Sequence, residues 1–159
     1  MQARRDSSCD RSFRNRNYLY VEQQVVTGHE AGFLLGDRAL GHWQVSPRDA
    51  AAVALIRDGR WQAKPSPVDW AVLPPLASPV ALRRDRQTGL AAVMMAPKGD
   101  CSAAFMPFAG ETHYSLYLSL FGYNITAGEQ AQARARLVIG AGLSDADVVS
   151  YYNHYEPKR

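Results

Sequence analysis

Residues 111–140, ETHYSLYLSLFGYNITAGEQAQARARLVIG, decide the fold class that we expect for this chain. The first part, residues 114–121, is a run rich in leucine and aromatic residues. The second part, residues 130–139, places Gln or Arg at even positions from 130 to 136 and apolar residues at odd ones: Ala131, Ala133, Ala135, Leu137 and Ile139. Successive side chains of a strand point to opposite faces of its sheet, so this alternation indicates a half-buried antiparallel strand. The stretch therefore predicts a β-rich fold.

Further short strands are predicted on both the N-terminal side and within the middle of the chain. Aromatic and β-branched residues favour strands, and clusters of Gly, Asp and Asn between them favour turns. The clearest hairpin joins residues 80–84 and 90–96 through Asp85–Gly89, where Gly89 supplies a residue that tolerates positive φ. The other expected strands are residues 18–26, 32–35, 39–45 and 101–108, with turns at residues 27–30, 36–37 and 97–100.

Two helices are expected. Residues 50–57 form the body of the first, with Ser46 as N-cap, Pro47 at the first helical position and Gly59 as the stop. The same short apolar run also fits a buried strand, and the sequence leaves that alternative open. The second helix, residues 144–155, closes the chain, and Ser144 with Asp147 resembles a capping box.

The region between residues 60 and 79 contains a cluster of prolines, which disfavours regular strands because proline lacks a backbone donor. Trp61 and Trp70 lie in the same region, and their large rings favour burial. We therefore expect an ordered loop that these two tryptophans anchor.

Together these elements predict one mainly β domain, an antiparallel β-sandwich with a short C-terminal helix, over residues 17–159. Residues 1–16 are polar and basic and are expected to be a disordered or loosely attached tail. They carry much of the net charge of +3, but no nucleic-acid-binding motif accompanies them, so no nucleic-acid partner is expected. No run approaches the roughly 18 apolar residues of a membrane span, and no signal peptide opens the chain. A cytoplasmic location is expected, unless the true N-terminus is missing.

Recognised cofactor and metal motifs are missing from the sequence, so neither a cofactor nor a metal is expected. The histidines, His29, His42, His113 and His154, do not pair at ligand spacing. The two cysteines, Cys9 and Cys101, are far apart and are expected to be free thiols.

Two polar clusters interrupt apolar sequence and place a carboxylate beside an imidazole. The first is His29 with Glu30, and the second is Glu111 with His113, followed by Tyr114. A histidine titrates near neutral pH and a glutamate can tune it, so these pairs suit general acid–base catalysis, with Tyr114 as a proton donor or stacking ring. The alternative is that they are polar residues at turns.

Three tryptophans, Trp43, Trp61 and Trp70, are candidates for substrate binding. Sugars have apolar faces that stack on aromatic rings, so exposed aromatic side chains on a sandwich suggest carbohydrate recognition. The alternative is that these rings pack in the core.

The chain resembles the closing strands and terminal helix of galactose-mutarotase-like supersandwich proteins. The resemblance covers roughly residues 80–155 and rests on Ala127-Gly128-Glu129, Arg134 to Gly140 and the helix after them. It implies a carbohydrate-active protein, of the kind found among aldose epimerases, polysaccharide lyases and glycoside hydrolases. The full fold of that family needs a longer chain, so this one corresponds to its C-terminal part or to a smaller sandwich of similar pattern.

The sequence thus predicts a protein that acts on or binds a sugar polymer, with His/Glu acid–base chemistry if it is catalytic. The alternative is a non-catalytic binding or structural module. Sheet edges that are left open favour pairing with another chain, so a homo-oligomer is a further expectation.

Overall fold

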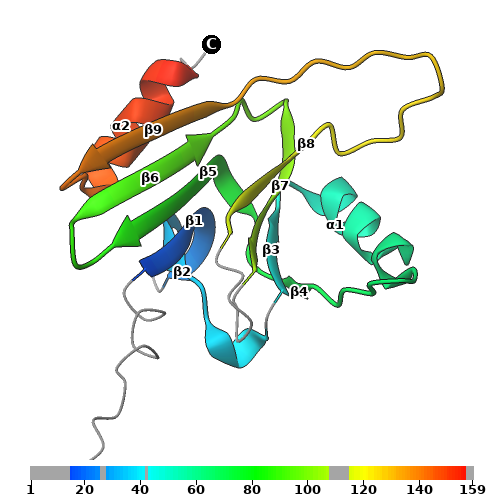
Figure 1. Ribbon diagram of the computed structural model, residues 1–159, viewed down its shortest axis with the longest axis horizontal. Coiled ribbons are helices and arrows are strands. Elements are labelled where there is room, and N and C mark those ends of the chain that lie inside the picture. Colours follow the sequence, from blue (N-terminus) through cyan, green and yellow to red (C-terminus); the bar gives the residue numbers. More distant parts are fainter. Residues whose placement is uncertain (1–14, 26–27, 42, 108–114, 157–159) are drawn as a thin grey trace, which may run out of the picture.

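The chain is a β-sandwich of two sheets, with strand order β2-β1-β5-β6-β9 in one and β4-β3-β7-β8 in the other (Figure 1). The computed structural model describes residues 15–25, 28–41, 43–107 and 115–156. Among these residues, no helix is long and apolar enough to cross a membrane. The elements are β1 (Asn15–Val25), β2 (Gly28–Leu35), η2 (Arg38–Leu40), β3 (Trp43–Pro47), α1 (Ala50–Arg57), η3 (Arg60–Gln62), β4 (Ala71–Val72), β5 (Leu76–Asp85), β6 (Leu90–Met95), β7 (Cys101–Pro107), β8 (Tyr117–Leu120), β9 (Arg136–Ala141) and α2 (Asp145–Tyr155).

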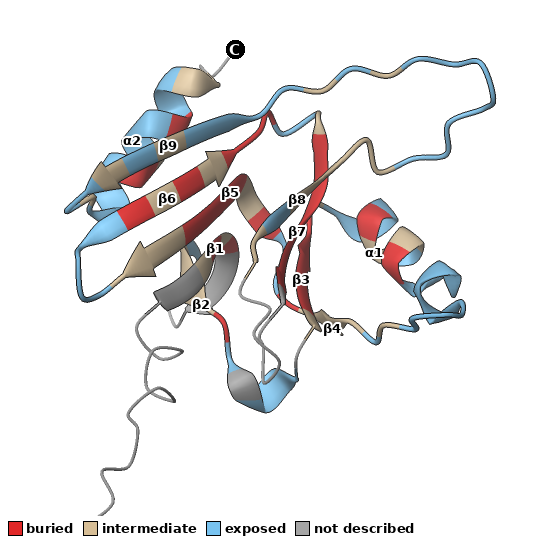
Figure 2. Cartoon of the chain, in the orientation of Figure 1, coloured by how far each residue is buried: buried red, intermediate tan, exposed pale blue. Residues whose placement is uncertain are grey.

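Three apolar clusters hold four layers together. The cluster between the two sheets contains Leu19 and Met106, and a second joins α2 to the five-stranded sheet through Val148. The third joins α1 to the outer face of the four-stranded sheet through Ile56 and Phe105. The two helices therefore cover opposite outer faces of the sandwich, and Figure 2 shows the buried segments concentrated in the inner strands.

The β5–β6 hairpin forms where the sequence predicts it, because its turn is stabilised locally. Asp85 accepts hydrogen bonds at its carboxylate from the Gln87 backbone N–H (3.0 Å) and the Thr88 hydroxyl (2.7 Å). Gly89 closes the turn with φ of 70°, a left-handed conformation that glycine adopts without strain.

The first helix is confirmed as α1, which excludes the alternative of a buried strand, but it begins later than expected. Its N-cap is Asp49, whose carboxylate accepts from the Ala52 backbone N–H at 2.9 Å. Ser46 and Pro47 belong to β3, where they pair with β7. Because Ser46 and Pro47 are part of the sheet, the helix begins after the next residue whose side chain can cap it, Asp49.

The second helix, α2, begins as the sequence predicts. Ser144 and Asp147 form a capping box, in which the Ser144 hydroxyl accepts from the Asp147 N–H (3.1 Å) and the Asp147 carboxylate accepts from the Ser144 N–H (2.8 Å). In the region between residues 60 and 79, Trp61 and Trp70 are in contact as expected, at 5.4 Å between ring centroids. The expectation of a loop without strands is wrong in part, because β4 lies in this region and β5 begins at Leu76 and includes Pro79.

The strands expected at residues 32–35 and 39–45, on either side of the turn at residues 36–37, do not pair with each other. β2 pairs with β1, and the chain then crosses to the other sheet, where β3 pairs with β7. The buried Gln44 amide fixes this crossing: its Nε2 donates to the Asp37 and Gly41 carbonyls, and its Oε1 accepts from the Asp37 N–H. A buried amide with all these partners is stable in the core, whereas turn residues alone do not specify which sheet the next strand joins.

Two boundaries in β1 and β2 also differ from expectation. Residues 28–30, expected in a turn, are the start of β2, and β1 begins at Asn15, inside the stretch expected to be a loose tail.

The stretch that indicated the fold class is only partly as expected. β8 and β9 lie in different sheets, and β9 begins at Arg136, so residues 130–135 are outside the strand. The expected buried face of β9 is exposed: Leu137 and Ile139 are 59% and 62% accessible. Val138 instead packs against the α2 cluster. The helix, and not the second sheet, covers β9, which reverses the buried face of this strand.

Candidate functional site

The two expected acid–base pairs fall mostly outside the part of the molecule that the structure describes. Glu111, His113 and Tyr114 lie outside the described residues. His29 and Glu30 are consecutive positions of β2, and consecutive positions of a strand belong to opposite faces of the sheet. Glu30 is exposed, and the side chain of His29 lies outside the described part of the molecule.

The three tryptophans are brought together, but mainly as packing residues. Trp70 lies at their centre, 5.6 Å from Trp43, 5.4 Å from Trp61 and 4.6 Å from Phe105 between ring centroids. Trp43 and Trp70 are half-buried, while Trp61 is 38% exposed. Trp61 lines a small cleft of about 170 Å³ together with Tyr123. The expectation of exposed stacking rings therefore applies to Trp61 more than to the other two.

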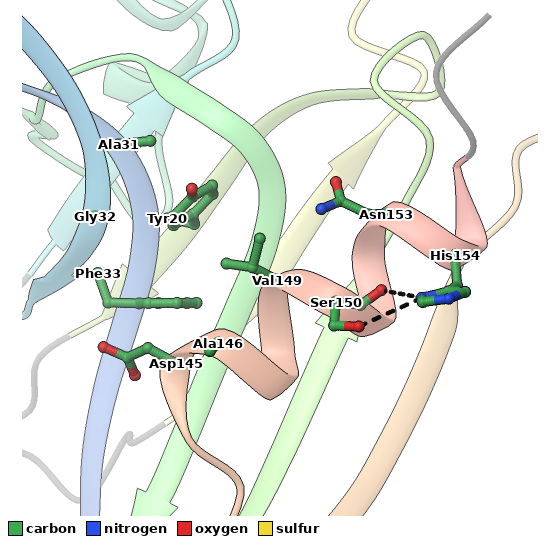
Figure 3. Close-up of a pocket in the computed structure, with 10 residues that line it drawn as sticks. All are labelled: Tyr20, Ala31, Gly32, Phe33, Asp145, Ala146, Val149, Ser150, Asn153 and His154. Atoms are coloured by element: carbon green, nitrogen blue, oxygen red, sulfur yellow. Dashed lines mark hydrogen bonds between the residues drawn. The ribbon is translucent and has the colours of Figure 1, made fainter.

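A larger cleft, of about 490 Å³, lies between α2 and strands β1 and β2 (Figure 3). Ring-bearing residues Tyr20 and Phe33 line it from the sheet, where they are directly opposite each other in the β1–β2 register. Their ring centroids are 5.0 Å apart and the planes are tilted by 42°. Such cross-strand aromatic pairs form a rigid apolar surface at low entropic cost. In Figure 3 the side chain of Val149 points from α2 toward these rings.

The helical wall of the cleft is fixed by Arg84 of β5. Its Nη1 lies 2.6 Å from Oδ1 of Asp145, and its Nη2 donates to the Leu143 carbonyl at 2.9 Å. The guanidinium carbon also lies 5.8 Å from the centroid of the Tyr18 ring. This one side chain therefore holds the first turn of α2 over the sheet, with the capping box at Ser144 beside it.

Polar groups on α2 complete the lining. Asp145, Ser150, Asn153 and His154 all contribute to the cleft, and all are exposed. The Nδ1 atom of His154 lies 2.7 Å from the Ser150 carbonyl. Because a carbonyl only accepts, Nδ1 carries the proton in this contact, and Nε2 of the neutral ring is then an acceptor. The cleft thus offers an apolar aromatic surface beside carboxylate, amide, hydroxyl and imidazole groups.

The size and lining of this cleft suit the binding of a small polar molecule. Among the described residues, no group of three or more His, Cys, Asp or Glu side chains could hold a metal ion. The buried Cys101 is a poor nucleophile because burial raises the pKa of its thiol to about 11, and only the thiolate attacks. A volume of about 490 Å³ lies in the range of small-molecule sites, roughly 300–1,000 Å³.

Sequence reasoning did not identify this cleft. Tyr20 meets Phe33 only through the β1–β2 register, and α2 joins them from the far end of the chain. A signal was present in the polar residues of α2, since Ser150, Asn153 and His154 recur at spacings that share one helical face.

Comparisons of the chain with protein-family models, with curated proteins and with solved structures found no match. The resemblance to galactose-mutarotase-like proteins therefore rests on the sequence pattern described above.

Proposed function

We propose that this protein is a non-catalytic carbohydrate-binding module, and that the sugar binds in the cleft between α2 and strands β1 and β2. The observation that carries the proposal is the aromatic pair Tyr20–Phe33 facing a helix rich in polar groups. A sugar ring presents C–H groups on its faces and hydroxyl groups around its edge. The two rings suit the faces, and hydrogen-bonding groups on α2 suit the hydroxyls.

Asn153 and Asp145 are the residues best suited to form hydrogen bonds with the hydroxyl groups of a sugar. An amide both donates and accepts, so Asn153 can hydrogen-bond a hydroxyl in either direction, whereas a carboxylate only accepts. Asp145 remains 59% exposed although it pairs with Arg84. Neutral sugars fit this lining better than acidic ones, because the Asp145 carboxylate repels a second anion.

The decisive test is a glycan-array screen followed by calorimetry with the glycans that bind. Asn153→Ala changes an exposed side chain and leaves the core intact, so we expect it to weaken binding by about three- to tenfold, as the loss of a hydrogen bond between neutral groups does. Phe33→Leu should weaken binding similarly by removing the stacking surface. Tyr123→Ala, an exposed aromatic at the smaller cleft, is the control and should leave affinity unchanged.

The same variants distinguish the two clefts. If Tyr123→Ala abolished binding while Asn153→Ala did not, the sugar would bind beside Trp61 and the proposed site would be wrong. If no neutral or acidic glycan bound at millimolar concentration, the carbohydrate proposal itself would fail. Acid–base catalysis by Glu111 and His113 stays a prediction from the sequence, for which turnover in His113→Ala is the measurement.

A further inference from the structure

Strand β9 is the terminal strand of the five-stranded sheet, and it exposes apolar side chains at that edge. Leu137 and Ile139 are 59% and 62% accessible. In the register with β6 they stand beside Met94 and Ala92, which are both half-buried. The exposed pair therefore extends the apolar side chains of β6 to the open edge of the sheet, where Figure 2 shows most of β9 exposed.

The backbone of β9 also directs hydrogen-bonding groups outward. The Gly142 N–H donates to the Gly89 carbonyl at 3.0 Å, and the adjacent pair in the register is Leu90 with Ala141. In an antiparallel ladder, alternate residues bond to the neighbouring strand, so the even positions of β9 bond to β6. The N–H and C=O groups of Leu137 and Ile139 consequently point away from the sheet. They form an edge that another strand can extend.

We infer that β9 pairs with β9 of a second copy of this chain, antiparallel and about a two-fold axis at Val138. In this register Leu137 of one copy faces Ile139 of the other, twice, and both positions have outward-pointing backbone groups. The exposed apolar side chains of the two edges, Leu137 and Ile139 of each copy, then cover one another. The two sheets become one continuous sheet with α2 of each copy on the same face.

The charges of the strand suit this antiparallel register. The same two-fold sets Arg136 opposite Gly140, and Arg134 opposite Gly142, so that no arginine faces another. A parallel, in-register pairing would instead place Arg136 beside Arg136, and like charges directly opposite each other destabilise a sheet. In the antiparallel contact both copies use the same edge, β9, about one two-fold axis. The edge of each copy is then occupied, so the contact yields a dimer and not a fibre.

The edges of the other sheet are less suited to such a contact. β4 has 2 residues and β8 has 4, whereas β9 has 6. Very short edge strands and prolines are devices that protect sheets from pairing, and β9 contains no proline. The opposite edge of the five-stranded sheet, β2, has 8 residues, but among its described side chains no large hydrophobic one is exposed, whereas β9 exposes Leu137 and Ile139.

The first test is the mass of the intact chain by sedimentation equilibrium from about 1 to about 300 µM, since dimerisation follows mass action. We expect a monomer–dimer equilibrium. Ile139→Lys should raise the dissociation constant by at least about tenfold, because it places two lysines at the interface. Ile139→Pro removes an outward N–H that β6 does not use, so it should do the same while the fold persists. Ile125→Lys, at an exposed site in the loop before β9, is the control and should leave the constant unchanged.

The second test reads the register by cross-linking in a Cys9→Ser background. At the two-fold the Val138 positions form a non-hydrogen-bonded pair, with Cα atoms about 4.5 Å apart, close enough for a disulfide. Val138→Cys should therefore cross-link between copies faster than Leu137→Cys or Ile139→Cys. A monomer at every concentration would overturn the inference. So would a dimer that Ile139→Lys and Ile139→Pro leave intact, or one that cross-links fastest at another position.

Discussion

Arg84 binds Asp145 with 2.6 Å between Nη1 and Oδ1, and so connects the middle of the sandwich to the first turn of its C-terminal helix. The pair is partly exposed, with side-chain accessibilities of 25% for the arginine and 59% for the aspartate, so solvent weakens the charge interaction itself. The Leu143 carbonyl and the Tyr18 ring add contacts to the same guanidinium. The position of α2, and with it the shape of the larger cleft, depends on this arginine.

Replacing this arginine should loosen the helix. Arg84→Met should lower the free energy of unfolding by about 1–2 kcal/mol. Most of this comes from the lost hydrogen bond to the Leu143 carbonyl, and a smaller part from the ion pair with Asp145, which solvent weakens. Urea denaturation measures this, and Arg86→Met, at an exposed position in the β5–β6 turn, is the matched control. Equal stability of the two variants would mean that Arg84 does not hold α2.

The capping box of α2 should make stability depend on acidic pH. The Ser144 side chain and backbone N–H both hydrogen-bond the Asp147 carboxylate and lower the pKa of Asp147 below its usual value. Because the folded pKa lies below the unfolded one, about 3.9, the contribution is complete above that pH and is lost as pH falls through the folded pKa. Asp147→Asn should therefore be less stable than the parent at neutral pH, with the difference shrinking in acid.

Urea titrations at several pH values between about 2 and about 7 check this expectation, since they span both protonation states of an aspartate. Asp69→Asn, exposed in the loop before Trp70, is the control. A constant difference between Asp147→Asn and the parent across this range would contradict the assignment.

Gly122 packs against Ser102 so closely that a Cβ at this position would overlap the Ser102 side chain. Ser102 is buried and donates from its hydroxyl to the Ser119 carbonyl at 3.1 Å, so it has little room to move. Gly122→Ala should cost about 1–3 kcal/mol, the usual effect of overpacking. Gly99→Ala, where a Cβ meets nothing within 4 Å, is the control and should be nearly neutral in thermal unfolding.

The far end of α2 is held by Tyr152, whose hydroxyl donates to the Glu156 carboxylate. The same carboxylate accepts from the Lys98 backbone N–H at 2.9 Å and so joins the helix to the turn before β7. Tyr152→Phe should lower the free energy of unfolding by about 1 kcal/mol near neutral pH, because the hydroxyl–carboxylate bond is lost. Tyr151→Phe, an exposed neighbour on the same helix, is the control.

This tyrosine should also affect stability in base. Burial, and then the bond to Glu156, raise the pKa of Tyr152 above its usual value of about 10. A raised pKa gives stability that is complete below the unfolded pKa and is lost as pH rises. The parent should therefore lose stability above about pH 10 more steeply than Tyr152→Phe. Identical slopes in urea titrations would contradict this.

Local signals in the sequence account for the features that could be predicted. The Asp85 turn and the Ser144–Asp147 box each form within a few residues, so the hairpin and α2 follow from the sequence. Which sheet a strand joins depends on distant partners. The buried Gln44 amide decides the crossing after β2, and α2 decides which face of β9 is buried, and neither appears in local periodicity.

The candidate site depends on the same distant contacts. Tyr20 and Phe33 belong to separate strands, and α2 joins them from the far end of the chain. A search for adjacent catalytic types instead selects neighbours such as His29 and Glu30, which occupy successive positions of one strand.

The burial of Cys101 has a use for studying motion in this molecule. Its side chain is fully enclosed, and its thiol donates to the Ala103 carbonyl at 3.2 Å. A maleimide or disulfide reagent can reach the sulfur only when β7 separates from its neighbours, so the labelling rate counts these openings. In a Cys9→Ser chain the labelling rate of Cys101 therefore measures how often the sandwich opens locally. A ligand that stabilises the closed state will lower this labelling rate.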